Sequence, residues 1–314
     1  MVIYIEKEFL DNFYLDYNEN CNSKLILATI FSTYGDVKYF IDIPINSADE
    51  LEHLKSENIY FACLSQYLPP ISVNSIKDHF FSRDKNDQVI IFTNESKEWH
   101  LQAEKKGALC FSFLNYVEKI KAIQEKVNKK IDLSQPFSGW EFINSFDCLP
   151  VNRITLNDGY VLTDKSGAKI RNNLFSIIKA LLENRDLDVV DFKIFTKDLN
   201  PLRPGTPDQI IKASKERLAL LNSYFARYKM KVQIVNNSLK SEFDFHDRFL
   251  LSNYFFIDCP RGFNLMPYKV SNSQIITQTI FDKYSYNRLK NLNKMHCDYL
   301  ASLENLETLS FKQT

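Results

Sequence analysis

The stretch Asp244-Phe-His-Asp-Arg-Phe-Leu-Leu-Ser-Asn253 carries the pattern on which the predicted fold depends. His246 and Arg248 are two positions apart, and Asn253 follows five positions after the arginine. Alternate residues of a strand point to the same face, so a strand here places the imidazole and the guanidinium side by side. Such a pair suits a phosphate, because the imidazole can attack phosphorus or donate a proton and the guanidinium neutralises oxygens.

The segments around this stretch predict a defined order of elements. Residues 210–230 have the pattern of a helix, residues 231–235 that of a buried strand, and a polar connection at 236–242 leads into the histidine strand. Residues 255–257 are typical of the returning strand of a hairpin, and Gly262-Phe-Asn264 follows it.

This order and spacing resemble the H-x-K-x4-D signature of the phospholipase D superfamily, with Arg for Lys and Asn for Asp. The altered motif is also similar to the phospholipase-D-like C-terminal domain of the MIT-domain proteins, which is thought to bind phospholipid head groups. The resemblance covers roughly residues 150–295 and implies a mixed sheet with flanking helices. It makes His246, Arg248 and Asn253 the catalytic candidates and Asn264 a phosphate contact.

The resemblance implies two alternative functions. Active members use two motif copies, of which one histidine attacks phosphorus and the other protonates the leaving group. This chain has one copy, so a metal-independent nuclease needs a homodimer that pairs two copies of His246, and it needs no cofactor. The family context suggests a prokaryotic, defence-type effector acting on nucleic acid or another phosphodiester. In the alternative, the degenerate module is non-catalytic and binds a phosphorylated ligand or a partner protein within a larger assembly.

Other residues near the motif add candidates. Lys197 and Arg203 follow a predicted strand at 189–195, in a loop where ligand sites of α/β proteins gather, and each is either a phosphate contact or a solvated side chain. Tyr254 and Tyr268 are candidates for base stacking. Arg248 has a structural alternative, an ion pair with one of three nearby carboxylates, Asp244, Asp247 or Asp258.

The rest of the C-terminal half predicts a domain over residues 151–314. We expect strands at 153–156 and 160–163 joined by the hairpin turn Asn157-Asp-Gly159, a helix at 171–183, a late strand at 275–280 and a final helix at 284–305. Thr206, Pro207 and Gln209 form a capping box with proline in the first turn, which starts the long helix.

The N-terminal half alternates strand and helix patterns and predicts an α/β domain with a largely parallel sheet, Rossmann-like or PIN-like, over residues 1–130. Residues 131–150 lack periodicity and are expected to be a linker. The predicted strands are residues 2–5, 24–30, 37–43, 59–63, 88–93 and 108–111. The predicted helices are residues 47–57, 73–82, 96–106 and 114–129, and Ser47 with Glu50 forms a capping box.

A PIN nuclease gathers carboxylates around Mg²⁺ or Mn²⁺, because metal-assisted hydrolysis uses hard oxygen ligands. Glu6 ends the first predicted strand, and Glu95 could serve as a later acid. Three more acids, Asp11, Asp42 and Asp87, have no defined placement. We expect no metal site and favour a scaffold or partner-binding role for this half; the alternative is a metal-dependent nuclease there.

Composition limits the class of protein. The 314 residues carry 39 basic and 39 acidic side chains, so the chain as a whole does not have the positive charge typical of nucleic-acid binding. Seven glycines are too few for a Gly-rich nucleotide loop. The six cysteines are scattered, which favours free thiols in a cytoplasmic protein, and no apolar run is long enough to cross a membrane.

Overall fold

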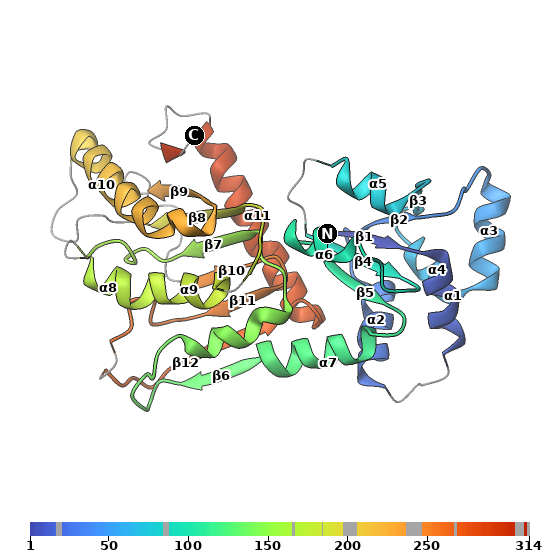
Figure 1. The fold of residues 1–314 in the computed structure, drawn as a ribbon, viewed down its shortest axis with the longest axis horizontal. Helices are drawn as coiled ribbons and strands as arrows, with labels where there is room; N and C mark the ends of the chain where they lie inside the picture. Colours follow the sequence, from blue (N-terminus) through green and yellow to red (C-terminus); the bar gives the residue numbers. More distant parts are fainter. Residues whose placement is uncertain are drawn as a thin grey trace. The chain divides into compact units, whose positions relative to one another are not determined.

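The computed structural model describes the chain apart from residues 17–20, 84–87, 165–166, 184, 197–205, 237–246, 267–268, 305–310 and 313–314 (Figure 1). It divides into two compact units. The first contains residues 1–125, 148–150 and 280–285, and the second contains residues 126–147, 151–279 and 286–314. One sheet is parallel and the other is mixed, so the predicted α/β class is confirmed.

The first unit is built on five parallel strands in the order β3-β2-β1-β4-β5. The strands are β1 (Val2–Ile5), β2 (Lys38–Ile41), β3 (Ile71–Ser72), β4 (Val89–Thr93) and β5 (Leu109–Ser112). Every residue of β1, β4 and β5 is buried. Strands of a parallel sheet are covered by helices on both faces, which explains these unbroken apolar runs.

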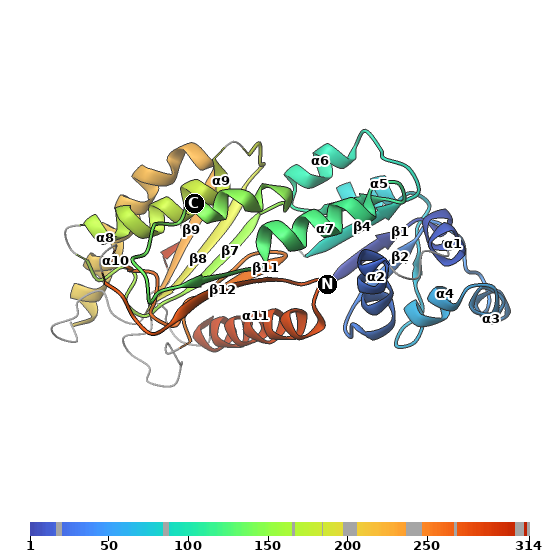
Figure 2. The ribbon, with the colours of Figure 1, turned by 90° about the horizontal axis from the view of Figure 1, so that it is seen from below.

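Helices pack on both faces of this sheet (Figure 2). They are α1 (Lys7–Leu15), α2 (Asn22–Thr33), α3 (Ala48–Glu57), α4 (Ile59–Leu64), α5 (Ile76–Phe81), α6 (His100–Lys105) and α7 (Tyr116–Val127). Residues of α5 and α6 join the core on the face that carries Tyr4 and Ile91. On the opposite face, the rings of Phe9 in α1 and Phe31 in α2 lie 5.1 and 5.5 Å from the ring of Phe92.

Two segments predicted as strands, residues 24–30 and 59–63, are helices. In α2 the buried apolar residues are Leu27, Ile30 and Phe31, a helical spacing inside a run that is apolar almost throughout. α4 begins where the side chain of Asn58 accepts a hydrogen bond from the Tyr60 N–H, at 2.9 Å. A short apolar run has the same composition in a buried strand and a buried helix, and packing decides between them.

The second unit has an eight-stranded sheet in the order β13-β9-β8-β7-β10-β11-β12-β6. The strands are β6 (Lys129–Asp132), β7 (Arg153–Asn157), β8 (Val190–Thr196), β9 (Met230–Asn236), β10 (Phe249–Leu251), β11 (Phe255–Asp258), β12 (Gln274–Thr279) and β13 (Phe311–Lys312). Strands β7, β8 and β9 are parallel, and the pairs from β7–β10 to β12–β6 are antiparallel. β10 and β11 form the predicted hairpin, so this sheet is mixed as expected.

The helices of this unit lie on both faces of the mixed sheet, with α8 to α10 on one face and α11 on the other (Figure 2). They are the 3-10 helix η1 (Glu141–Cys148), α8 (Ala168–Ile170), the π-helical turn η2 (Arg171–Phe175), α9 (Ser176–Leu182), α10 (Pro207–Phe225), the 3-10 turn η3 (Ala226–Tyr228) and α11 (Lys283–Glu304). The predicted capping box of Thr206 and Gln209 is present at the start of α10.

Two expectations for this half need correction. Residues 160–163 form no strand. The chain turns away after β7, and β10 occupies the place beside β7 that the second strand of a hairpin would have filled. Residues 131–150, expected to be a linker, contain the end of β6, which pairs with β12, and the helix η1.

Two predictions from composition concerned the cysteines and membrane-spanning segments. Its six cysteines are free thiols, of which Cys110 and Cys259 are buried. Each described helix is too short or too polar to span a lipid bilayer.

The buried side chain of His296 predicts that the stability of the fold decreases in acid. His296 of α11 stacks on Phe195 of β8, with 4.1 Å between ring centroids. Burial, with a smaller effect of the Lys193 charge, lowers the pKa of His296 from 6.5 to about 4. The unfolded chain therefore binds a proton that the folded chain excludes, and we expect the free energy of unfolding to fall as pH drops from about 6.5 towards 4.

The variant His296→Phe keeps an aromatic ring and removes the titrating group. Urea denaturation at about pH 7 and about pH 5 should show a smaller loss of stability for the variant than for the wild type. Equal losses in the two proteins would contradict the assignment to His296.

Candidate functional site

The second unit presents polar residues where its parallel strands end. β7 ends at Asn157 and β8 at Thr196. The antiparallel strand β10 starts beside them, because Phe249 is in register with Asn157. Arg248 directly precedes Phe249 and lies at the same edge of the sheet. The carboxyl ends of parallel strands are where open α/β sheets bind ligands.

Three of the predicted site residues lie outside the described residues, namely His246, Lys197 and Arg203. Arg248, Asn253 and Asn264 are described. The structure brings Arg248 and Asn264 to one group of loops, and it places Asn253 at the other end of β10.

Arg248 is half-buried and forms no ion pair with any described residue. Its Nη1 donates to the carbonyl oxygen of Pro260 at 3.2 Å, and its guanidinium carbon lies 5.6 Å from the centre of the Tyr160 ring. Its Nε is enclosed without a described partner, and such an N–H costs roughly 1–3 kcal/mol. The groups that contact the guanidinium are thus neutral, and the buried carboxylate of Asp158 acts on its charge without forming an ion pair.

Two of the three acids considered as partners of Arg248 are described, and neither forms an ion pair with it. Asp258 pairs instead with Arg288 at 2.8 Å. Asp247 forms no ion pair with a described residue, and its carbonyl oxygen accepts a hydrogen bond from Asn157 Nδ2 at 2.6 Å. Asp244 lies outside the described residues. An anion brought by a ligand would therefore be the first direct ionic partner of this cation among the described groups.

Asp158 organises the backbone around Arg248. Its carboxylate accepts hydrogen bonds from the Phe263 N–H at 2.7 Å and the Tyr160 N–H at 2.9 Å. Burial raises the pKa of Asp158, and this effect outweighs the lowering by the two N–H groups and by the Arg248 charge. One side chain thus ties the turn after β7 to the loop after β11.

Gly262 allows this loop to approach. Its φ of +81° lies in the left-handed region, and an added Cβ would stand 2.8 Å from Asp158 Oδ2 and 3.1 Å from Arg248 Cδ. Asn264, two residues on, donates from Nδ2 to the Tyr160 carbonyl oxygen at 2.9 Å. The amide N–H donor that the family resemblance assigned to a phosphate is thus used on the backbone here.

Asn253 is buried and forms hydrogen bonds that hold two parts of the chain together. It is fully buried, its Oδ1 accepts hydrogen bonds from the N–H groups of Asn152 and Arg153 at 3.2 Å each, and its Nδ2 donates to Asn152 Oδ1 at 2.6 Å. It follows β10, whereas Arg248 precedes that strand. The amide joins the β10–β11 turn to the start of β7, so it is not part of the site proposed below.

The aromatic residue beside the site differs from the expected ones. Tyr254 is fully buried, which corrects its prediction as a stacking residue, and Tyr268 lies outside the described residues. Tyr160, which the sequence analysis assigned to a strand, is 45% exposed next to Arg248. The sequence feature next to Tyr160 is Asn157-Asp-Gly159, which indicates a turn but does not indicate the direction of the chain after the turn.

In the first unit, the proposed acids are engaged in structural contacts. Glu6 accepts a hydrogen bond from the Asn94 N–H at 2.6 Å and pairs with Lys97 at 3.3 Å. Lys7 pairs with Asp11 through its ammonium and with Asp42 through its backbone N–H. Two more candidates give no support, since Glu95 is exposed and Asp87 lies outside the described residues. No three Asp, Glu, His or Cys side chains within the described ranges are grouped to hold a metal ion.

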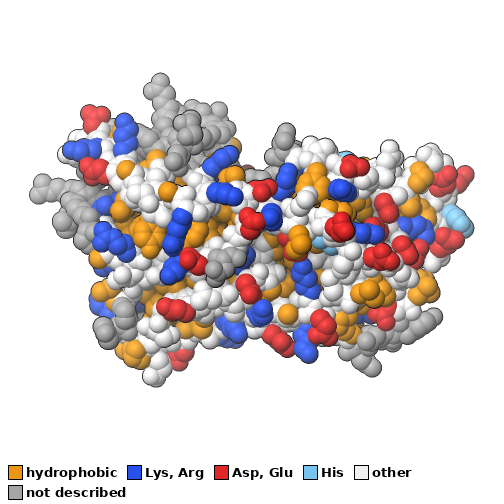
Figure 3. Space-filling view, in the orientation of Figure 1, with side chains coloured by type: hydrophobic (Ala, Val, Ile, Leu, Met, Phe, Trp, Pro, Cys, Tyr) orange, Lys and Arg blue, Asp and Glu red, His pale blue; other side chains and the backbone are white. Residues whose placement is uncertain are grey.

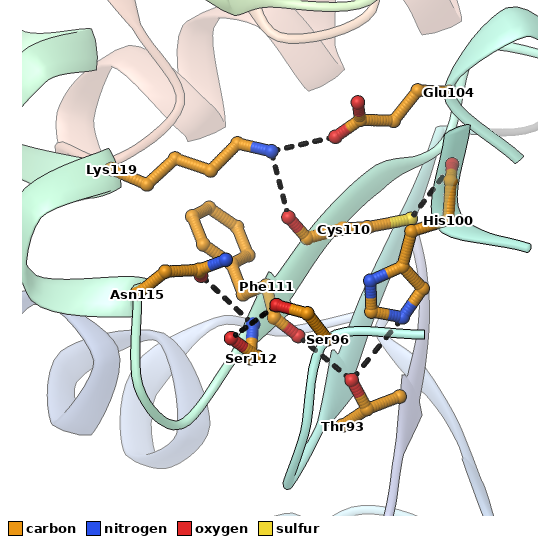
Figure 4. Close-up of polar contacts among 9 residues, drawn as sticks. All are labelled: Thr93, Ser96, His100, Glu104, Cys110, Phe111, Ser112, Asn115 and Lys119. Carbon is orange, nitrogen blue, oxygen red and sulfur yellow. Dashed lines mark hydrogen bonds and ion pairs between the residues drawn. The ribbon is translucent and has the colours of Figure 1, made fainter. Parts of the chain in front are cut away.

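The carboxyl ends of β4 and β5 form a closed polar network (Figure 4). Thr93 Oγ1 lies 3.2 Å from His100 Nε2, Ser96 Oγ donates to Ser112 Oγ at 3.1 Å, and Asn115 Oδ1 accepts the Ser112 N–H at 2.9 Å. Burial, with two nearby lysines, lowers the pKa of His100 to about 4. These groups form hydrogen bonds with one another and with the backbone around them.

The structural role of Asn253 predicts a loss of stability. In Asn253→Ala two backbone N–H groups lose their acceptor, so we expect unfolding to become easier by about 2–3 kcal/mol. The exposed Asn144, changed to Ala, is the matched control and should shift stability by less than about 0.5 kcal/mol. Urea denaturation checks both, and a wild-type midpoint for Asn253→Ala would contradict the structural assignment.

No protein-family model matches this chain, and no curated protein matches it by sequence. A function must therefore be argued from the side chains themselves. Among the described residues, the strongest argument comes from the edge of the mixed sheet where Arg248 lies.

Proposed function

We propose that the second unit binds the phosphate group of a phosphodiester at Arg248. The observation that carries this proposal is a half-buried guanidinium, fixed by Pro260 and Tyr160, that forms no ion pair with a described residue. A planar guanidinium has five N–H donors, and a phosphate oxygen accepts them through charge-assisted hydrogen bonds. The site lies at the carboxyl ends of β7 and β8, where such ligands are expected.

We propose further that His246, two residues before Arg248, acts on the bound phosphodiester. One imidazole attacks phosphorus and forms an N–P bond, while the P–O bond to the leaving group breaks. His246 of a second copy gives its proton to the departing oxygen. It then takes a proton from the water that hydrolyses the phosphohistidine. This chemistry needs a homodimer and no metal, and it would fit a cytoplasmic defence-type effector.

A non-catalytic phosphate-binding module is the second candidate, and a specific observation favours it. Of the three described residues predicted to hold the phosphoryl oxygens, Asn253 is buried away from the edge and Asn264 gives its N–H to Tyr160. Arg248 remains as the described phosphate contact. Binding without hydrolysis requires less of the site than cleavage, because it needs no second motif copy.

The binding proposal is tested with Arg248→Gln. Loss of charge-assisted hydrogen bonds should weaken binding of a fluorescent oligonucleotide by roughly 10- to 100-fold at low salt. Arg227→Gln is the matched control, since Arg227 is 53% exposed and already pairs with Glu183. Equal affinity of wild type and Arg248→Gln, measured by fluorescence anisotropy, would remove the proposal.

The catalytic proposal is tested separately in EDTA with single- and double-stranded DNA and RNA. We expect the wild type to cleave, His246→Ala to bind without cleaving, and light scattering to show a dimer. Binding without cleavage by the wild type would leave the non-catalytic module as the function. Equal cleavage by His246→Ala would place any activity elsewhere.

A further inference from the structure

An exposed aromatic ring lies directly beside the proposed phosphate site. Tyr160 is 45% exposed, and the guanidinium carbon of Arg248 lies 5.6 Å from its ring centre. A single nucleotide spans a separation of this kind between its phosphate and its base. The guanidinium lies over the ring, so the ring surface that Arg248 leaves exposed can meet a base while the guanidinium meets the neighbouring phosphate.

The ring is carried by a fixed piece of backbone. The Tyr160 N–H donates to Asp158 Oδ1 at 2.9 Å, and its carbonyl oxygen accepts from Asn264 Nδ2 at 2.9 Å. Both ends of this peptide segment are thus tied to residues that also surround Arg248. Such pre-organisation lowers the ordering cost of binding.

We propose that Tyr160 is the stacking surface for a base of a single-stranded nucleic acid whose adjacent phosphate binds Arg248. The inference rests on the proposed function and names its substrate class. Every base has a π-face, so a tyrosine platform binds single strands with little sequence preference, whereas paired bases inside a duplex are not available to it.

A phospholipid head group shares the phosphate but fits the site less well. It has no ring to stack on Tyr160, and anionic membranes are bound by clusters of basic residues or by apolar faces that insert. On the face seen in Figure 3, Lys and Arg are interspersed with Asp and Glu over the described residues.

The test separates the base from the phosphate. Fluorescence anisotropy measures binding of the full chain to a labelled oligothymidylate and to an abasic strand of the same length, in EDTA at low salt. We expect the wild type to prefer the strand with bases. Because the ring also holds Arg248, Tyr160→Leu should weaken binding of both strands, and the loss on the strand with bases should exceed the loss on the abasic strand by about 5- to 150-fold, while Tyr160→Phe keeps wild-type affinity. Tyr284→Leu, at a tyrosine that is 69% exposed, is the control and should change neither.

Three outcomes would overturn this inference. They are equal wild-type affinity for the two strands, an equal loss on both strands in Tyr160→Leu, and binding to phosphatidylserine vesicles in place of oligonucleotides. Failure of the proposed function looks different, because Arg248→Gln would then bind the abasic strand as tightly as the wild type. A loss in Tyr160→Leu that is larger on the strand with bases than on the abasic strand supports the inference.

Discussion

The carboxylate of Asp158 is the constraint on which the arrangement around Arg248 depends. It bonds the N–H groups of Tyr160 and Phe263, which are about a hundred residues apart in the chain. Burying a carboxylate has a large desolvation cost, and these two short, charge-assisted bonds offset part of it. Phe263 in turn stacks on Trp140, with ring centroids 5.6 Å apart, so the loop is held by a polar contact and an apolar one.

The charged groups at the carboxyl ends of the parallel strands have different partners in the two sheets. In the first unit, Glu6 is neutralised by Lys97 and caps a backbone N–H, and Thr93 and His100 lie within hydrogen-bonding distance. In the second unit, Arg248 forms bonds only to neutral described groups. A charge that the fold holds half-buried without an ion pair to a described group has a free energy that an anionic ligand can lower. This difference, rather than the fold of either unit, is why we assign binding to the mixed sheet.

The sequence predicted the strands whose apolar runs are bounded by polar residues, such as β4 and β8, and the helix start at Thr206, where a capping box is a local signal. It failed at α2 and α4, since an apolar run does not distinguish a buried helix from a buried strand without its neighbours.

The residues of the proposed site were predicted from the sequence with the same limit, since local patterns do not indicate which elements become neighbours. Arg248 was identified by its spacing from His246, because side-chain alternation along a strand is a local rule. The positions of Asn253 and Tyr160 depend on which strand pairs with β7. β10 takes that place, although it follows β7 by about ninety residues. The Asn157-Asp-Gly159 sequence indicates a turn in either topology, so its local chemistry could not tell a hairpin from the observed path.

An arginine at position 248 suits the contacts that the structure shows there. An ammonium is a compact point charge with three donors, whereas a guanidinium is planar, stacks on aromatic rings and has five donors in a fixed fork. Arg248 uses one donor on the Pro260 carbonyl and lies beside the Tyr160 ring. A lysine at this position could not pack in this way and still direct several N–H groups at an oxygen cluster. An arginine at this position therefore suits the proposed site, in which the exposed Tyr160 ring and the cation bind neighbouring parts of one ligand.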